Sequence, residues 1–252
     1  MNDHSFHLYT AKLQQNVYST AKGHIRLTLL RKDIEEFVPS FSSPPLRVLD
    51  VGCGGGQFAK ICLDAGHRVR LLDANEEMIC SAAQTVGSYI ESGAAALVCE
   101  DFQQASFASD ERFDLVLMHG SAEWMPRAED AILNACDLLA PGGYLSLLMY
   151  NQDTHILKKG INGHLLGRDP NKKRKLFPPG ALGVADTAAV LSRRDGTIQI
   201  QSGIRIFHKF FRHIDTAEHP ISHWLNQEIK YFRTPPFSLL GQHSHFIWKK
   251  SI

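Results

Sequence analysis

The sequence contains little cysteine, and what it has is scattered. No C-x-x-C pattern occurs in the 252 residues, and the number of cysteines is odd. They are Cys53, Cys62, Cys80, Cys99 and Cys136. This distribution excludes a disulfide framework and a cysteine-based structural zinc site, and it is typical of a protein from a reducing compartment.

The sequence also lacks any long hydrophobic run, although 44% of its residues are hydrophobic. No apolar stretch approaches the roughly 20 residues that a bilayer-spanning helix needs. The first residues, Met1–His4, are polar and do not begin the basic-then-apolar pattern of a signal peptide. We therefore expect a cytoplasmic protein that has no membrane partner.

Charge imbalance and repetition are absent as well. The formal net charge is +1, and 21% of the residues are charged. Such a balance gives no overall attraction to polyanions, so a nucleic-acid surface has to come from local clusters of basic residues. We find no internal repeat and no low-complexity tract. The length and composition predict one large domain over residues 1–252.

What the sequence does contain is a strand, a glycine loop, a helix and a second strand in succession. Leu46–Val51 is a run of mostly branched apolar residues, typical of a buried parallel strand. Four of the five residues in Gly52–Gly56 are glycines, which let a ligand approach the backbone and permit positive φ. Residues 57–65 predict a helix, and Val69–Leu72 predicts a strand that ends in Asp73.

An acidic residue at the end of the second strand indicates an adenosine-type cofactor. Asp73 follows the glycines by about twenty residues, where a carboxylate can bind the two hydroxyls of a ribose. The loop reads acid-x-G-x-G-x-G from Asp50 to Gly56, whereas a dinucleotide fingerprint would require glycine in place of Gln57. Taken alone, the pattern leaves open a nicotinamide or flavin site and a plain glycine-rich turn without a ligand.

The chain continues as an alternation of helices and strands. Helices are expected at residues 24–38, 76–86 and 128–139, and strands at residues 95–99, 113–118 and 144–149. In a doubly wound sheet, the loops after the third and fourth strands lie at the same carboxyl edge as the glycine loop. We therefore expect Phe102 and His119 beside that loop. The Phe102 ring either packs on a purine or turns into the core.

The segment 152–185 interrupts this alternation and reads as a basic loop. Its basic residues include Lys158, Lys159 and the run from Lys172 to Lys175. They either contact phosphates or a carboxylate, or are simply solvated. Later elements are a helix at 186–194, an extended run at 198–211, a helix at 220–232 and a strand at 246–248. His243 and His245 have no acidic or cysteine ligand near them in the sequence, so no metal is expected.

Two spaced motifs resemble those of class I S-adenosylmethionine-dependent methyltransferases. One is the loop from Asp50 to Gly56 together with Asp73, and the other is the run LLAPGGYLSL at residues 138–147. The resemblance implies an α/β, Rossmann-like fold whose sheet has seven mostly parallel strands and helices on both faces. The last strand would enter antiparallel between the fifth and the sixth. It also implies S-adenosyl-L-methionine as the cofactor.

The resemblance can be made narrower. The matching residues form the patterns Asn16-x-Tyr18-x-x-x-Lys22-Gly23-x-x-Arg26, Arg47–Asp50, His119-x-x-x-Glu123-Trp124, Tyr150-Asn151, Lys172-Lys173-x-x-Leu176 and Gly203–His208. Over nearly its whole length the chain resembles the bacterial tRNA 5-carboxymethoxyuridine methyltransferases. That family methylates the carboxylate of 5-carboxymethoxyuridine at the wobble position of certain tRNAs, and the product is the methyl ester.

Carried over position by position, the resemblance implies a set of cofactor contacts. These residues are Arg26, Gly52, Cys53, Asp73, Phe102, Gln103 and His119. Taken alone, Arg26 reads as a solvated helix residue, but its guanidinium matches the planar carboxylate of methionine. Cys53 departs from the glycine that family members carry there, and the Phe102 position is small in them. Contacts made by the backbone do not depend on these side chains.

The implied reaction is an in-line methyl transfer from a sulfonium to a carboxylate. The leaving group is neutral and the acceptor is already ionised at pH 7, so no catalytic acid or base is expected. Tyr150, Asn151 and Arg205 are candidates for positioning the substrate. We expect residues 1–45, an N-terminal helical extension, and 152–185 to cap the site, and the tRNA anticodon arm to be the partner.

Other functions remain compatible with these motifs. A methyltransferase acting on a small-molecule carboxylate or another acceptor would use the same fold and glycine loop. The basic segment 158–175 is the feature that favours RNA over such a substrate. A non-catalytic protein that binds the cofactor or tRNA is the second alternative, and the complete set of glycines with Asp50 and Asp73 argues against it.

Overall fold

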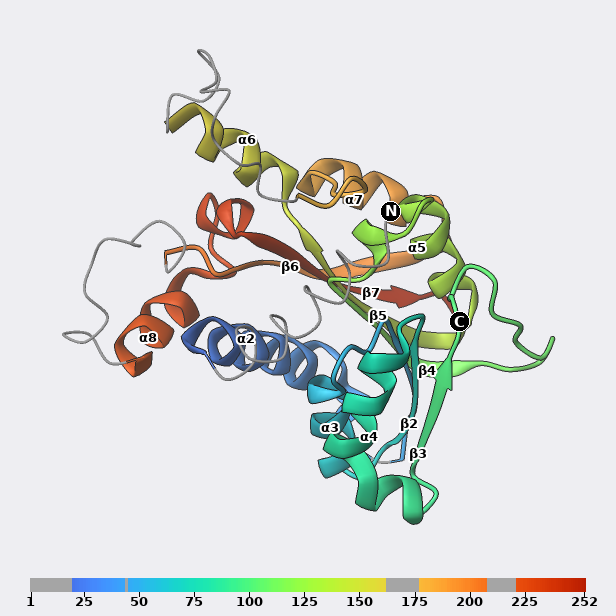
Figure 1. Cartoon of the computed structure of the whole chain (residues 1–252). Coiled ribbons are helices and arrows are strands. Elements are labelled where there is room, and N and C mark those ends of the chain that lie inside the picture. The colour runs from blue at the N-terminus through green and yellow to red at the C-terminus, as the bar shows by residue number, and fades with distance from the viewer. Residues whose placement is uncertain (1–19, 44, 162–176, 208–220) are drawn as a thin grey trace, which may run out of the picture.

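The structure, a computed structural model, describes residues 20–43, 45–161, 177–207 and 221–252, and a seven-stranded sheet forms its centre (Figure 1). The strands are β1 (Arg47–Val51), β2 (Arg68–Asp73), β3 (Ala95–Cys99), β4 (Phe113–His119), β5 (Leu139–Tyr150), β6 (Gly196–Ile204) and β7 (His243–Lys250). Their order is β3-β2-β1-β4-β5-β7-β6. The pairs from β3 to β5 are parallel, and β7 runs antiparallel between β5 and β6. This confirms the predicted sheet and its inserted antiparallel strand.

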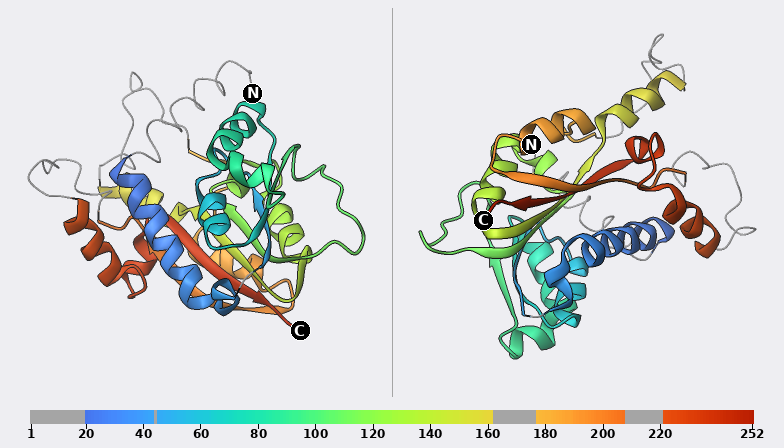
Figure 2. Two further views of the ribbon diagram at one scale, coloured as in Figure 1. Left: turned by 90° about the horizontal axis from the view of Figure 1, so that it is seen from below. Right: turned by 180° about the vertical axis from the view of Figure 1, so that it is seen from behind.

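Helices cover both faces of the sheet, because neighbouring residues of each strand point to opposite sides. The helices are α2 (Ala21–Phe37), α3 (Gln57–Asp64), α4 (Glu76–Glu91), α5 (Ala128–Asp137), α6 (Gln152–Ile161), α7 (Val184–Leu191) and α8 (Ile221–Tyr231). Val48 of β1 belongs to the core that α2, α3 and α4 cover, whereas Leu49 belongs to the core beneath α5 and α7. Figure 2 shows these two layers from two further directions.

Helix α4 illustrates how local signals set an element's start. Asn75 caps it by accepting hydrogen bonds from the N–H groups of Glu77 and Met78, at 2.8 and 3.2 Å. The predicted helix ended at Val86, where the backbone indeed leaves helical geometry (φ −118°, ψ 19°). The helix then resumes and continues to Glu91, which the periodicity did not predict.

The Pro-Gly-Gly segment is not the simple turn that the sequence predicted. It lies inside β5, where the pairing shifts from Phe113 with Leu139 to Leu115 with Tyr144. A Cβ atom on Gly143 would lie 2.9 Å from the carbonyl oxygen of Ala140, so this bulge has no room for a side chain. Because the pairing continues through this bulge, β5 begins at Leu139, five residues before the predicted start at Tyr144.

The predicted basic loop begins instead as helix α6, which projects from the body of the molecule (Figure 1). Lys158 and Lys159 lie in its last turn, while Lys172–Lys175 lie outside the described residues. The extended run predicted at 198–211 is β6, which ends at Ile204 because Arg205 adopts a left-handed conformation, φ 62°. Residues 208–211 lie outside the described part of the chain.

Candidate functional site

The glycine loop joins β1 to α3 in a backbone conformation that favours glycine. Gly52, Gly54 and Gly56 all have positive φ, at 68°, 54° and 75°. A Cβ atom on Gly52 would lie only 2.4 Å from the Cβ of Ser121, which follows β4. The Ser121 hydroxyl in turn donates to the Val51 carbonyl oxygen at 2.7 Å. The loops after β1 and β4 therefore pack directly against each other at the carboxyl edge.

Asp73 ties the end of β2 to the same loop. Its Oδ2 accepts a hydrogen bond from the Gly54 N–H and its Oδ1 accepts one from the Asn75 N–H, both at 2.9 Å. Burial raises the pKa of Asp73, and these two N–H groups partly offset that effect. Each carboxylate oxygen has a second lone pair available. Asp73 can thus hold the loop and still accept hydrogen bonds from the hydroxyls of a ligand.

Asp50, in β1, and Cys53, within the loop itself, are both buried. Burial raises the pKa of the Asp50 carboxyl to about 7, and the nearby charge of Asp73 adds to the effect. Burial and these two carboxylates also raise the pKa of the Cys53 thiol. A neutral thiol is a weak nucleophile, so Cys53 can line a site but is not suited to covalent catalysis.

His119 ends β4 beside the helix that follows the glycine loop. Its ring meets the Phe58 ring edge-on, with 4.7 Å between centroids. Its Nε2 lies 2.8 Å from the Ser146 Oγ, while its buried Nδ1 has no hydrogen-bond partner among the described residues. Burial, then the nearby His245 and Arg26, lower the pKa of His119 well below its ordinary value. The imidazole is neutral at pH 7 and can accept a hydrogen bond.

Arg26 reaches the same edge from α2. Its Nη2 lies 3.5 Å from the His243 Nε2, and its Nε has no partner among the described residues. Glu123, in the short helix η3 (Ala122–Trp124), is fully buried. Its Oε1 accepts from the Tyr150 N–H at 3.1 Å, and burial raises its pKa to about 7. In the sequence, only the motif His119-x-x-x-Glu123-Trp124 distinguishes Glu123, because a glutamate a few residues after a strand does not by itself indicate a buried carboxyl.

Tyr150 and Arg205 lie near the first residues of β7. The Tyr150 ring is 4.4 Å from the His243 ring and 5.9 Å from that of Phe177, between centroids. The Arg205 carbonyl oxygen accepts from the Gln242 N–H at 3.3 Å, and its side chain is buried. Arg26 of α2, Tyr150 of β5, Arg205 after β6 and His243 of β7 therefore lie at the same edge of the sheet.

Asn151 has a structural role that the sequence did not indicate. Its Nδ2 donates to the carbonyl oxygens of Leu239 and Gly241, and its Oδ1 accepts from the N–H groups of Asp153 and Thr154. All of its amide hydrogen-bonding groups are therefore occupied by the backbone. The side chain caps α6 and is not available to position a substrate.

Phe102 and Gln103 follow β3, as predicted, and their side chains make contacts within the protein. The buried Phe102 ring packs in the core with Phe107, 6.1 Å between centroids, which decides between the two placements left open for it. The Gln103 Nε2 donates to the Arg127 carbonyl oxygen at 3.0 Å. Any ligand contact by Phe102 would therefore involve its backbone.

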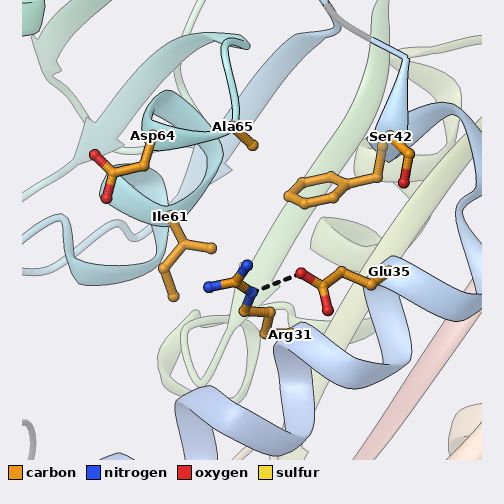
Figure 3. Close-up of a pocket in the computed structure, with 7 residues that line it drawn as sticks. Arg31, Glu35, Ser42, Ile61, Asp64 and Ala65 are labelled. Atoms are coloured by element: carbon orange, nitrogen blue, oxygen red, sulfur yellow. Dashed lines mark hydrogen bonds and ion pairs between the residues drawn. The ribbon is translucent and has the colours of Figure 1, made fainter.

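A surface pocket of about 510 Å³ lies elsewhere, between α2 and α3 (Figure 3). Arg31 pairs with Glu35 there, and Ile61 and Asp64 line its other side. The lining residues of α3 lie in its last turns and those of α2 lie in its second half, whereas the glycine loop precedes the first turn of α3 and Arg26 lies in the first half of α2. We therefore do not assign the pocket to the site at the carboxyl edge.

Among the described residues, no three histidine, cysteine or acidic side chains are grouped closely enough to hold a metal ion. His243 and His245 instead make hydrogen bonds or ring contacts within the protein. Within the same part of the chain, each helix is too short or too polar to traverse a lipid bilayer.

The sequence is similar to known methyltransferases. The chain is 28% identical over 254 aligned positions to the tRNA 5-carboxymethoxyuridine methyltransferase of Escherichia coli (strain K12), covering 99% of this chain and 97% of that protein. A trans-aconitate 2-methyltransferase of Streptomyces avermitilis is 28% identical, but over only 45% of this chain and 42% of its own length.

Solved structures show the same fold at lower sequence identity. Magnesium protoporphyrin IX methyltransferase (ChlM) from Synechocystis PCC 6803, crystallised with bound SAH, matches 99% of this chain and 96% of its own with a TM-score of 0.65 at 15% identity. The fold is therefore that of the class I methyltransferases. The family model described as a methyltransferase domain matches residues 23–188, well over half of the sequence. The chain belongs to this methyltransferase domain family.

Proposed function

We propose that this methyltransferase transfers a methyl group from S-adenosyl-L-methionine to the carboxylate of 5-carboxymethoxyuridine at the wobble position of tRNA. The observation that carries the proposal is the match to the Escherichia coli enzyme of that name, which extends over 99% of the chain rather than over the cofactor-binding half alone. We further propose that the enzyme acts in the cytoplasm, where its tRNA substrate is found.

The residues at the carboxyl edge fit this cofactor. Asp73 has free lone pairs for the ribose hydroxyls, and the backbone of Gly52 and Cys53 can lie beneath the amino-acid portion. Arg26 offers a guanidinium to a carboxylate, and His119 offers a bare nitrogen. Phe102 and Gln103 would contribute backbone groups. When bound, the cofactor supplies an electrophilic methyl group on a sulfonium.

The protein's part in the reaction is positioning. Because the leaving group is a neutral thioether and the acceptor is an ionised carboxylate, no side chain has to donate or remove a proton. Holding the acceptor oxygen in line with the methyl carbon and the sulfur lowers the barrier by removing rotational and translational freedom. The buried, neutral Cys53 and His119 are consistent with a mechanism without covalent or general-base catalysis.

For the substrate we propose two kinds of contact. Arg205 would select the acceptor carboxylate, and the aromatic cluster of Tyr150, Phe177 and His155 would stack on an unpaired base of the anticodon loop. In this cluster the His155 ring stacks on Phe177 with 3.7 Å between centroids. Residues 1–45 and 152–185 would cap the site, with Lys158 and Lys159 of α6 near the tRNA backbone.

A small-molecule carboxylate is the second candidate acceptor, and the similarity to a trans-aconitate 2-methyltransferase is the observation that favours it. That similarity covers less than half of the chain, so it is confined to part of the domain. Membership of the methyltransferase family argues against the nicotinamide or flavin site that the glycine loop alone left open.

Nucleoside analysis of tRNA tests the proposal directly. In cells that lack this protein, mass analysis should find the free acid at the wobble uridine accumulated and its methyl ester missing, and purified protein with S-adenosyl-L-methionine should convert one into the other. Unchanged methyl-ester levels, together with no methyl transfer to this tRNA in vitro, would reject the tRNA assignment. Cofactor binding in calorimetry without transfer to any RNA would favour the non-catalytic alternative.

A further inference from the structure

Four polar side chains form a continuous hydrogen-bonded relay through the core, ending at His119. The Asp33 Oδ2 lies 2.6 Å from the His245 Nδ1, and the His245 Nε2 lies 2.8 Å from the Ser146 Oγ. The same Ser146 Oγ lies 2.8 Å from the His119 Nε2. At the other end, the Arg233 Nε donates to the Asp33 Oδ1 at 2.8 Å. Helix α2 and strands β7, β5 and β4 each contribute one member.

This relay lies where an apolar core would be expected. Asp33, Ser146 and His245 are each fully buried, and the residues on either side of Ser146 in β5 are apolar. Burying such groups costs free energy unless every one is hydrogen-bonded. The relay satisfies that condition everywhere except at its last atom, the His119 Nδ1, for which the described part of the chain provides no partner.

The direction of the hydrogen bonds follows from the charges. An ionised Asp33 can only accept, so the His245 Nδ1 carries a proton. Arg233 pairs with both Asp33 and Glu36, but Glu36 is largely exposed and its charge is screened by water, so within the core Arg233 balances Asp33. A second proton on the buried His245 would then add an uncompensated charge, so its Nε2 keeps a lone pair. The Ser146 hydroxyl then donates to His245, and its oxygen accepts from the Nε2–H of His119. The proton of His119 is thereby fixed on Nε2, and its Nδ1 is left bare.

We propose that Asp33, His245 and Ser146 are positioning residues that hold His119 in the Nε2–H tautomer, so that its Nδ1 accepts a hydrogen bond from the α-ammonium group of the cofactor. This inference rests on the proposed function for the identity of that cation. Arg26, which interacts electrostatically with His119, suits the carboxylate of the same amino-acid moiety, and an ammonium needs an acceptor beside it. The lowered pKa of His119 keeps the ring neutral, as an acceptor requires.

The other tautomer of His119, with its proton on Nδ1, would weaken binding of the cofactor. If His245 carried both protons, the Ser146 hydroxyl would have to donate to His119, whose proton would move to Nδ1. An N–H group would then face the ammonium, and the two donors would repel each other.

Charged groups lie at both ends of the relay. At the Asp33 end they are Arg233 and its second partner Glu36, and at the His119 end they are Arg26 and Glu123, which interact with each other.

The first test measures the tautomer without any cofactor. Long-range proton–nitrogen correlation spectra of ¹⁵N-histidine-labelled full-length protein should show His119 protonated on Nε2, with the signal assigned from a His119→Gln spectrum. Ser146→Ala should convert it to a mixture of tautomers. Ser202→Ala is the matched control, because Ser202 is an equally buried serine that lies opposite His245 in the pairing of β6 with β7, and its Oγ has no hydrogen-bond partner among the described residues.

The second test measures binding of S-adenosylhomocysteine and of an analogue that lacks the α-amino group. The wild-type protein should bind S-adenosylhomocysteine more tightly than the analogue. Ser146→Ala should weaken the binding of S-adenosylhomocysteine about 10-fold and leave the affinity for the analogue unchanged. Ser202→Ala should alter neither value. A purely structural relay would instead weaken both ligands equally, or neither.

Several outcomes would overturn the inference. A proton on Nδ1 of His119 in the normal protein would do so, as would Ser146→Ala leaving both tautomer and preference unchanged. If Ser146→Ala does not fold, equal affinity of the normal protein for the two ligands overturns the proposal. Binding of S-adenosylhomocysteine without methyl transfer to tRNA would reject the proposed function and leave the relay intact, whereas no binding at all would overturn both.

Discussion

At the scale of single residues, Gly52 is a position in the candidate site that does not accommodate a side chain. Its φ of 68° disfavours any residue with a Cβ atom, and that atom would lie 2.4 Å from the Ser121 Cβ. We expect Gly52→Ala to lose about 1–2 kcal/mol of stability from the backbone conformation alone, and more from displacing Ser121. Urea unfolding would measure this loss, and calorimetry should show weaker binding of S-adenosylhomocysteine.

Gly87→Ala provides the matched control for Gly52→Ala. Gly87 lies within α4, and a Cβ atom there would meet nothing within 4 Å. Because alanine favours a helix over glycine, this variant should gain roughly 0.5–1 kcal/mol and bind the ligand normally. Equal stability of the two variants would show that position 52 has room for a side chain, which would contradict this prediction.

Glu123 gives a second prediction at this scale, on the pH dependence of stability. Its folded-state pKa of about 7 lies above the ordinary value of 4.5, so between these pH values the folded protein holds a proton that the unfolded chain has released. Stability therefore falls as the pH rises through this window. Glu123→Gln keeps the acceptor for the Tyr150 N–H and cannot ionise. We expect it to change stability little at pH 4.5 and to stabilise the protein by up to roughly 3 kcal/mol at pH 8.

Urea unfolding of the normal protein and Glu123→Gln at the two pH values measures this effect. The exposed Glu129, which pairs with Arg193, serves as the control, and Glu129→Gln should cost less than about 1 kcal/mol at either pH. Parallel pH profiles for the normal protein and Glu123→Gln would mean that burial does not perturb this carboxyl.

At the scale of elements, the parts that the sequence predicted well are those that local signals define. The unit from β1 to Asp73 was located to within about a residue at most ends, because a branched apolar run, consecutive glycines and a strand-end acid each mark a boundary. Strand β3 was located at the observed residues.

The parts that the sequence did not predict depend on contacts between distant residues. Helix α6 stands away from the core, so Ile156, Leu157 and Ile161 remain exposed and no complete apolar stripe marks it. Its start depends on Asn151, whose side chain is itself held by the segment near Gly241. The relay joins Asp33, Ser146 and His245, which are separated by a hundred residues or so, and no sequence spacing indicates such a chain.

Helix α6 carries the prediction that belongs to this scale. If it lies against the tRNA backbone, neutralising its last turn with Lys158→Gln and Lys159→Gln should raise the apparent KM for tRNA several-fold and leave kcat nearly unchanged, because phosphate contacts bind substrate and transition state alike. Arg193→Gln with Arg194→Gln is the matched control. These two arginines are also adjacent, but they pair with Glu129 and Asp137 near the start of β6. If both double variants raised KM equally, Lys158 and Lys159 would act only through the overall charge of the protein and not through contact with the tRNA.

At the scale of the whole molecule, the net charge of +1 means that any affinity for a polyanion comes from how the charges are arranged. The two candidate acceptors therefore differ in how binding depends on salt. A tRNA that contacts several lysines or arginines releases counterions, and the logarithm of its association constant should fall linearly with the logarithm of the salt concentration, with a slope of roughly −0.7 to −0.9 per contact.

We expect a slope of about −2 to −4 for tRNA, measured by filter binding or fluorescence between low and physiological salt. Binding of S-adenosylhomocysteine provides the internal control. Its affinity should change little over the same salt range, because this small ligand is not a polyanion and releases no condensed counterions when it binds. The variant with Lys158→Gln and Lys159→Gln should reduce the tRNA slope by about 1 to 2. A slope near zero, together with methylation of a free small carboxylic acid, would transfer the assignment to the small-molecule acceptor. The same methyl-transfer chemistry would then serve a substrate that needs no basic surface.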